Sequence, residues 1–424
     1  MSMALINNLA QLATSSGRSD ALAIVQAGLE AINTPRVVRQ KVQLSGDQLK
    51  VADKVFNLSQ FKRLRVIAFG KAASEATATL EEILGNRILD GVVIDVTTQE
   101  HRFVRAFRGT HPRPSDENVA AAREIVGLAD GTQADDLFLV VVSGGGSAML
   151  CWPPEECNQG IKLYDEFLQA GGTIQELNTV RRHLSDLKGG GLAKLLYPAT
   201  VIGLIFCDVP GSHFADVASG PTFLDQSTES DALTILQRHK IEADFLLHET
   251  PKEEKYFNKV FNIPLVANEV ALQAMAEKAQ ALGWKPEILS AEIYDFPEEA
   301  LNKIFALKPK SEKIAIIAGG EVSLVIKDVH GTGGRNQYLG MSALGKLGDK
   351  DTFVSLASDG VDNSPPAGVI VDKTTMLKAE ELALDTKHYL THSDTLTFFE
   401  KTGGLIYTGP TGANVSDLML LLRE

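Results

Sequence analysis

The chain has 424 residues, of which 44% are hydrophobic and 22% charged, and its formal net charge is −13. This length predicts two domains, and the acidic balance argues against nucleic acids and anionic membranes as partners. Three cysteines form neither a disulfide framework nor a zinc-ligand spacing, and no apolar run approaches the roughly 20 residues that cross a bilayer. Because the N-terminus also lacks the layout of a signal peptide, we expect a cytoplasmic protein.

Short apolar runs alternate with longer amphipathic segments through the first half of the chain. We expect strands over residues 64–69, 91–96, 137–142 and 201–206, and helices over residues 72–84 and 115–128. Strands separated by helices at this spacing are typical of right-handed βαβ units and a mainly parallel sheet. The pattern therefore predicts an α/β fold.

A polar, charged stretch from about residue 231 to 260 interrupts this pattern. We place the domain boundary there, with an N-terminal domain over residues 1–235 and a C-terminal domain over residues 236–424. The second region also alternates, which predicts α/β structure again. Its expected helices cover residues 269–282 and 333–347, and its expected strands cover residues 313–318, 322–327, 352–357 and 367–371.

Small, basic and acidic residues follow the expected strands directly. In open parallel sheets, ligands bind beyond the carboxyl ends of the strands, so these positions are the candidate site. The candidates in chain order are Gly70, Lys71, Ser143, Gly144, Gly145, Gly146, Ser147, Cys207, Asp208, Gly319, Gly320, Glu321, Ser358, Asp359, Gly360 and Asp362.

The segment SGGGS at 143–147 is predicted to bind an anion through its backbone N–H groups, because glycines let successive amides approach one ligand. The alternative is a tight turn between strand and helix. Lys71 lies between Gly70 and Ala72, where the backbone can come close to a ligand, and is predicted to bind phosphate or carboxylate. A solvated surface lysine is the alternative there.

Arg335 lies in TGGRN at 332–336, which predicts a turn opening a helix. A cation is unfavourable at the positive end of a helix, so we expect a bound anion to compensate, and arginine suits bidentate recognition of phosphate or carboxylate. A plain surface arginine is the alternative. Asp208, Asp359 and Asp362 are acid/base or metal candidates, each with an Asx turn or a helix N-cap as its alternative.

Several stretches taken together resemble the class II glycerate kinases, whose C-terminal part is the MOFRL domain. The resemblance covers nearly the whole chain. It implies an ATP- and Mg²⁺-dependent kinase that makes 2-phosphoglycerate from D-glycerate. It also implies a Rossmann-like N-terminal domain and a second α/β domain of MOFRL type, with the active site in the cleft between them. The stretches are AFGKAA (68–73), THPRPSDEN (110–118), VSGGGSAML (142–150), LNTVRRHLSDLKGGGLA (177–193), CDVPGSHFADVASGPT (207–222), GTGGRNQ (331–337), SDGVDNSPPAG (358–368) and TGPTGANVSDL (408–418).

The family's functional residues map by motif onto Lys71, Asp208, Arg335 and Asp359. Lys71 and Arg335 would bind the substrate carboxylate and the transferring phosphate. Asp208 would receive the proton of the 2-hydroxyl and Asp359 would position magnesium, and these two roles could be exchanged. The loop at 143–147 with Gly320, Glu321 and Asn336 completes the expected binding set, and the metal ligands are left unassigned.

The chain departs from the family at two places. Ser212-His213 and Tyr338 stand where relatives usually have acidic residues, which puts secondary carboxylate roles in doubt. Two rival functions are an NAD(P)-dependent hydroxypyruvate reductase and a non-catalytic sensor of a phosphorylated hydroxy acid. The first needs a dinucleotide fingerprint, which is not evident. The sequence leaves the oligomeric state open, a homo-oligomer included.

Overall fold

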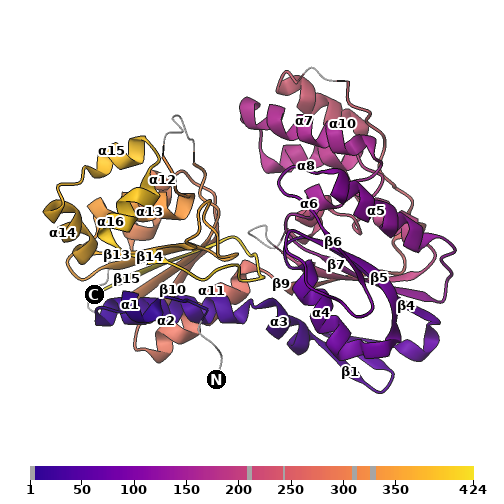
Figure 1. The fold of residues 1–424 in the computed structure, drawn as a ribbon, viewed down its shortest axis with the longest axis horizontal. Coiled ribbons are helices and arrows are strands. Elements are labelled where there is room, and N and C mark those ends of the chain that lie inside the picture. Colours follow the sequence, from indigo (N-terminus) through magenta and orange to yellow (C-terminus); the bar gives the residue numbers. More distant parts are fainter. Residues whose placement is uncertain (1–4, 208–212, 242–243, 308–312, 325–330) are drawn as a thin grey trace. The chain divides into compact units, whose positions relative to one another are not determined.

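The chain forms two compact units in the computed structural model, each containing a six-stranded sheet (Figure 1). The structure describes residues 5–207, 213–241, 244–307, 313–324 and 331–424. We call the unit that contains residues 34–207 and 213–266 the parallel-sheet unit, and the unit that contains residues 5–33 and 267–424 the mixed-sheet unit. Both alternate helices and strands, as the sequence predicts.

The parallel-sheet unit contains six parallel strands in the order β6-β5-β4-β7-β8-β9. Counted along the chain, this is the order 3-2-1-4-5-6 of dinucleotide-binding Rossmann folds. Every residue of β7 and β8 is buried, which explains their continuous apolar sequence. The strands are β4 (Arg63–Phe69), β5 (Ile88–Asp95), β6 (Arg105–Arg108), β7 (Asp136–Val142), β8 (Thr200–Phe206) and β9 (Val260–Val266).

Helices surround this sheet, and α7, α8 and α10 gather beyond α6 around their own small apolar core (Figure 1). A three-stranded antiparallel sheet precedes β4 and consists of β1 (Val42–Ser45), β2 (Gln48–Val51) and β3 (Lys54–Asn57). The helices are α3 (Thr34–Lys41), α4 (Ala73–Leu84), α5 (Asp116–Ala129), α6 (Gly146–Met149), α7 (Glu155–Ala170), α8 (Ile174–His183), α9 (Gly191–Leu196) and α10 (Glu229–Arg238), with 3-10 turns η1 (Leu58–Gln60), η2 (Gly85–Arg87), η3 (Phe214–Ser219) and η4 (Glu254–Tyr256).

The mixed-sheet unit has the strand order β10-β11-β15-β12-β13-β14, in which only β10 and β11 pair in parallel. The last strand of the chain therefore lies inside the sheet. Of the strand expected over 322–327, residues 322–324 are not in a strand, and the rest lies outside the described residues. The strands are β10 (Lys285–Ile293), β11 (Ile314–Gly320), β12 (Thr352–Ala357), β13 (Gly368–Asp372), β14 (Leu405–Ile406) and β15 (Asp417–Arg423).

The helix α2 (Ser16–Ala31) belongs to this unit although it begins the chain, because it packs on α11 (Asn268–Ala281). Its Arg18 forms a buried ion pair of 2.7 Å with Asp372. The placement of α2 in the mixed-sheet unit and of β9 in the parallel sheet differs from the boundary expected at residues 235/236. Chain order alone does not reveal which helix covers which sheet. The other helices are α1 (Leu9–Leu12), α12 (Pro297–Ala306), α13 (Arg335–Ala343), α14 (Lys373–Glu381), α15 (Thr386–Thr391) and α16 (Thr395–Thr402), with η5 (Leu344–Lys346).

Candidate functional site

Two predicted site segments meet in the parallel-sheet unit, at the carboxyl ends of the neighbouring strands β4 and β7. The backbone N–H of Lys71 donates to the Gly144 carbonyl at 2.8 Å, and the N–H of Ser143 donates to the Phe69 carbonyl at 3.1 Å. The strand order reverses between β4 and β7, which is where open α/β sheets bind ligands. The structure thus brings Lys71 and the 143–147 loop together at this position.

Gly70 makes this close contact between the loops possible. Its φ is +112°, and a Cβ added there would lie 2.3 Å from the Ser143 Oγ. A side chain is excluded both by the conformation and by the space. At Gly145, whose φ is +81°, an added Cβ would lie 3.2 Å from the His111 Cδ2 and 3.3 Å from the Lys71 Cγ. His111, from the stretch THPRPSDEN, therefore lies beside the loop.

The two serines of the loop, Ser143 and Ser147, make different contacts. Ser143 is 2% exposed, and its Oγ accepts from the Ala72 N–H at 3.1 Å, so it joins the two loops instead of facing a ligand. Ser147 is half-buried, and its Oγ lies 2.9 Å from the Ser219 Oγ. Both serines are candidate binding residues, and the Ser147 hydroxyl, which is less buried, is the better placed of the two to contact an anion.

Backbone N–H groups of the loop remain available for an anion. Within the described part of the chain, the N–H groups of Gly144, Gly145 and Ser147 donate to no other group. The following helix, α6, has only four residues, so its dipole is much weaker than the expected helix would supply. Anion binding here depends on the loop amides and on neighbouring cations such as Lys71.

Arg335 begins α13 in the mixed-sheet unit, as TGGRN predicts. Its Nε donates to the Asp417 Oδ2 at 2.7 Å, and its Nη1 forms an ion pair with Glu321. Burial acts to lower the pKa of Arg335, but the two carboxylates outweigh it and hold this pKa above its ordinary value. The prediction that a bound anion compensates the helix end is therefore wrong in part, because the protein's own carboxylates do so.

Asp417, the first residue of β15, is a site residue that the sequence analysis missed. Its carboxyl is buried beside Arg335, and burial raises its pKa to about 7 against the opposing effect of the Arg335 charge. The signal was present in the apolar run DLMLLL at 417–422, which predicts a buried strand with an acid at its first position.

Asp362 caps the start of α13. Its carboxylate accepts from the backbone N–H groups of Asn336 at 3.1 Å and Gln337 at 2.9 Å. Burial raises the pKa of Asp362, and these hydrogen bonds oppose the rise. The cap that we kept as the alternative is the observed role. Asn336, expected to bind substrate, is 1% exposed, and its amide oxygen accepts from the Ser355 hydroxyl at 2.5 Å, so it supports the same helix start.

The remaining candidates are Asp359, Gly320 and Asp208, and the structure describes the first two. Asp359 follows β12 and is half-buried, and its Oδ1 accepts from the Val361 N–H at 3.1 Å, as in an Asx turn. At Gly320 an added Cβ would lie 2.3 Å from the Ile293 backbone nitrogen, so close packing against β10 explains this glycine. Asp208 lies outside the described residues.

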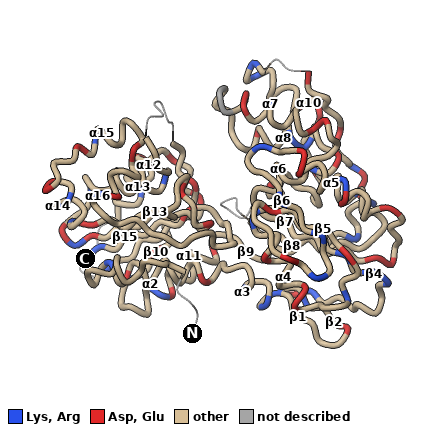
Figure 2. Tube along the Cα trace, viewed as in Figure 1, with Lys and Arg blue, Asp and Glu red and all other residues tan. Residues whose placement is uncertain are grey.

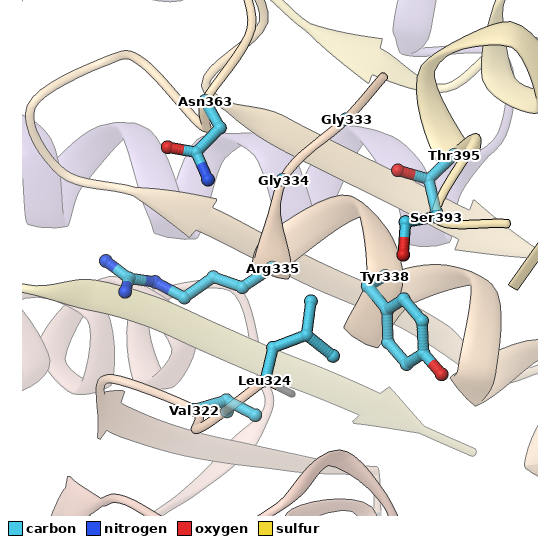
Figure 3. A pocket seen from close by; sticks show the side chains of 9 residues that line it. All are labelled: Val322, Leu324, Gly333, Gly334, Arg335, Tyr338, Asn363, Ser393 and Thr395. Atoms are coloured by element: carbon cyan, nitrogen blue, oxygen red, sulfur yellow. The ribbon is translucent and has the colours of Figure 1, made fainter. Parts of the chain in front are cut away.

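A small pocket lies beside Arg335 in the mixed-sheet unit (Figure 3). Its volume is about 160 Å³, enough for a small organic group. Figure 3 shows the Arg335 guanidinium and the Tyr338 ring extending in different directions from the start of α13. Tyr338 stands where the resemblance has an acid, and it gives this wall an aromatic surface. The lining residues are Val322, Leu324, Gly333, Gly334, Arg335, Tyr338, Asn363, Ser393 and Thr395.

A preformed metal cage is absent from the described ranges, where no group of three or more His, Cys, Asp or Glu side chains could hold an ion. Mg²⁺ in kinases is usually held by one or two carboxylates together with the phosphates of the nucleotide. Asp359, which is half-buried shortly after β12, is a described carboxylate that could serve in this way.

Comparisons with known proteins cover almost the entire chain. The glycerate 2-kinase of Pyrococcus horikoshii is 32% identical over 433 residues, with 96% of this chain and 97% of the relative covered. The D-glycerate 2-kinase of Thermotoga maritima is 32% identical over 425 residues, covering 94% and 97%. A protein named putative hydroxypyruvate reductase, from Agrobacterium vitis, is 32% identical over 387 residues, with 85% and 99% covered.

Structure and family models agree with these matches. The crystal structure of a glycerate kinase from Thermotoga maritima superposes with a TM-score of 0.82 at 30% identity, covering 96% of this chain and 99% of that one. A domain of unknown function, DUF4147, matches residues 20–248, and the MOFRL family matches residues 314–417. The expected family is thereby confirmed. The chain belongs to the family of the glycerate 2-kinases, with a DUF4147 domain followed by a MOFRL domain.

Proposed function

We propose that this protein is an ATP-dependent glycerate 2-kinase, which transfers the γ-phosphoryl group of ATP to the 2-hydroxyl of D-glycerate. The observation that carries the proposal is Lys71 beside the glycine loop at the strand-order reversal, because such a site combines backbone donors with a cation. Phosphoryl transfer requires little covalent chemistry from the protein and depends on this kind of charge placement. The names of the relatives point to the same reaction.

Lys71 and the loop amides would hold an anionic group of one substrate. Arg335 would hold another, since only part of its planar fork of donors is used by Asp417 and Glu321. Magnesium would arrive bound to ATP and neutralise charge on its phosphates, with Asp359 as the carboxylate that positions it. The placement of the active site in a cleft between the domains stays a prediction.

The reaction also needs a proton acceptor. As the 2-hydroxyl oxygen of glycerate forms its bond to the γ-phosphorus, the bond to the β–γ bridging oxygen breaks and ADP leaves. The hydroxyl proton passes to a carboxylate, for which Asp208 is our choice and Asp359 the exchange partner. A carboxylate within hydrogen-bond reach of the hydroxyl is the usual base in such transfers.

A hydroxypyruvate reductase is the second candidate, favoured by the Rossmann strand order and by the name of one relative. The loop departs from the dinucleotide fingerprint, however, because buried Met149 stands at the position of the third glycine. NADH oxidation with hydroxypyruvate, followed by absorbance, tests this candidate directly. Turnover there without ADP release from ATP and glycerate would replace the kinase proposal.

The decisive experiment is a coupled ADP-release assay over a panel of small hydroxy acids. D-Glycerate should give the highest kcat/KM, and ³¹P NMR should place the phosphate of the product on the 2-oxygen. Phosphate on the 3-oxygen would contradict the 2-kinase assignment. Binding of 2-phosphoglycerate without ADP release from any acid would favour the sensor.

The proposal includes a cytoplasmic location and small-molecule partners only. Figure 2 shows acidic and basic residues interspersed along the elements of both units. The described cysteines form no disulfide, which suits a reducing compartment. Among the described residues, no helix combines the length and the apolar character needed to cross a bilayer.

A further inference from the structure

Arg181, in the last turn of α8, is a cation that forms no ion pair with a carboxylate of the described residues. The next residue, Arg182, forms ion pairs with Asp216 and with Asp225, the latter at 3.1 Å. Arg181 has no carboxylate within ion-pair distance in the described part of the chain, and its nearest polar contact is the Asn178 Oδ1 at 3.4 Å from its Nη1. Two adjacent arginines on one helix thus differ in their counter-charges.

The surroundings of Arg181 make the absence of a paired carboxylate energetically unfavourable. The residue is half-buried, and its guanidinium lies 5.8 Å from the centre of the Tyr164 ring. Burial lowers the pKa of Arg181 to about 10, which still leaves it charged at neutral pH. The negative end of α8 offsets only a small part of the cost of burying this cation. A desolvated cation with no carboxylate in contact is unfavourable, because the more distant charge of Glu156 opposes the effect of burial only in part, and an anionic ligand would remove the penalty.

Hydrogen bonds connect Arg181 to the glycine loop. Asn178, which contacts Arg181, accepts from the Ser219 hydroxyl at 3.2 Å, and the Ser219 Oγ lies 2.9 Å from the Ser147 Oγ. Ser147 is the last residue of the loop, so two side chains separate the guanidinium from the loop hydroxyl. All four residues belong to the parallel-sheet unit.

The backbone at this connection is strained. Ala218 and Ser219 both have positive φ, +51° and +61°, which non-glycine residues rarely adopt. A Cβ added at Gly146 would lie 2.7 Å from the Ala218 Cβ, so this strained turn packs directly on the loop. Backbone strain of this kind persists where the surroundings hold a residue in a functional position. Here it places the Ser219 hydroxyl between Asn178 and Ser147.

We propose that Arg181 is an anion-binding residue of the site at the glycine loop. Its guanidinium binds the oxygens of a carboxylate or phosphate group on the substrate that the loop amides and Ser147 contact. This inference rests on the proposed function for the identity of the substrate. In either case the planar guanidinium donates to two oxygens of one group. That group is either the carboxylate of the hydroxy acid or a phosphate of the nucleotide.

Arg181→Gln and Arg181→Lys test the proposal, with Arg113→Gln as the matched control. Arg113 contacts the same Tyr164 ring at 5.5 Å, but it is paired with Asp165 and its side chain is 52% exposed. Each full-length variant is titrated by calorimetry with D-glycerate, with a non-hydrolysable ATP analogue and with inorganic phosphate. KM and kcat are measured for both substrates.

Arg181→Gln should raise Kd at least ~10-fold for one substrate, since it removes a charge-assisted bidentate contact. A rise for D-glycerate identifies the carboxylate, and a rise for the analogue and phosphate identifies the nucleotide. Arg181→Lys should recover only part of the affinity, and Arg113→Gln should bind as the parent does. Unchanged Kd and KM in folded Arg181→Lys or Arg181→Gln would overturn the proposal. If the parent binds anions through Arg181 but releases no ADP, the inference stands and the kinase proposal fails.

Discussion

Arg335 and Asp417 form an ion pair of 2.7 Å between the first residue of α13 and the first residue of β15. The pair is not isolated, because Glu321 contacts the same guanidinium and Asp362 caps the same helix start. The arrangement fixes the direction of a planar group of donors beside the small pocket. It also means that Arg335 cannot be exchanged for a simple point charge without losing an internal contact.

Arg335→Lys should therefore lower kcat/KM at least ~10-fold although the charge is retained, because lysine cannot contact two carboxylates and a substrate oxygen in parallel. A fall in kcat alone indicates a contact made in the transition state, and a rise in KM indicates ground-state binding. Arg423→Lys is the matched control, since Arg423 pairs with Asp351 at 2.9 Å on the same strand as Asp417. Equal kinetics in the two variants would remove Arg335 from the site.

Lys71→Ala should lower kcat/KM by at least ~10²-fold, the scale for losing one positioned charge-stabilising group. The control is Lys62→Ala. Lys62 precedes the opposite end of β4 and its side chain is 81% exposed, so its loss should leave the kinetics unchanged. Activity of Lys71→Ala within a few-fold of the parent would show that the loop acts without this lysine.

Comparing Gly70→Ala with Gly131→Ala distinguishes the cost of a left-handed backbone from the cost of a steric clash. Both glycines have positive φ, but an added Cβ meets nothing within 4 Å at Gly131 and lies 2.3 Å from the Ser143 Oγ at Gly70. Gly131→Ala should cost about 1–2 kcal/mol of stability, the penalty for left-handed backbone alone. Gly70→Ala should cost more and also reduce activity, since the loops must separate. Urea unfolding and the ADP-release assay measure both effects, and equal costs would contradict the close contact.

Asp95 should make stability depend on pH. It is buried at the end of β5, and burial raises its pKa to about 6 from an ordinary 3.8, against the hydrogen bond from the Ser74 N–H at 3.0 Å. The native state then holds its proton more tightly than the unfolded state. The free energy of unfolding should therefore fall as pH rises from about 4 to 6, by at most about 3 kcal/mol.

Asp95→Asn should remove this contribution. Urea unfolding at several pH values between 4 and 8 would detect the difference in slope between parent and variant. The variant keeps an oxygen that can accept from the Ser74 N–H, so its stability at pH 8 should equal or exceed that of the parent. An identical pH dependence in the two proteins would show that the pKa of Asp95 is the same in the native and unfolded states.

Strands that are buried on both faces were predictable from sequence because their continuous apolar runs have one explanation. The expected bounds 137–142 and 201–206 differ by one residue from β7 and β8. The alternation of strands and helices predicted the parallel sheet. The residues that follow the strands predicted that Lys71 and the glycine loop belong to one site. These features depend on local pattern and on a general rule of open sheets.

What sequence reasoning missed depends on contacts between distant segments. The docking of α2 on α11 follows from complementary surfaces that no periodicity reveals, and so does the insertion of β15 beside β11 and β12. The same holds for the counter-charges of Arg335. A cation at a helix start indicates an anion nearby, but only the fold shows that Asp417 and Glu321 provide it.

The position of β15 at the centre of the mixed sheet has a consequence for biosynthesis. β15 pairs with both β11 and β12, which are synthesised before it, and α2, which is synthesised long before α11, belongs to the same unit. The parallel-sheet unit, by contrast, has all six of its strands once residue 266 has emerged. Domains generally fold as units during synthesis. The nascent chain therefore completes the strands of the parallel-sheet unit first, and the face of α2 that packs on α11 stays uncovered until α11 has emerged.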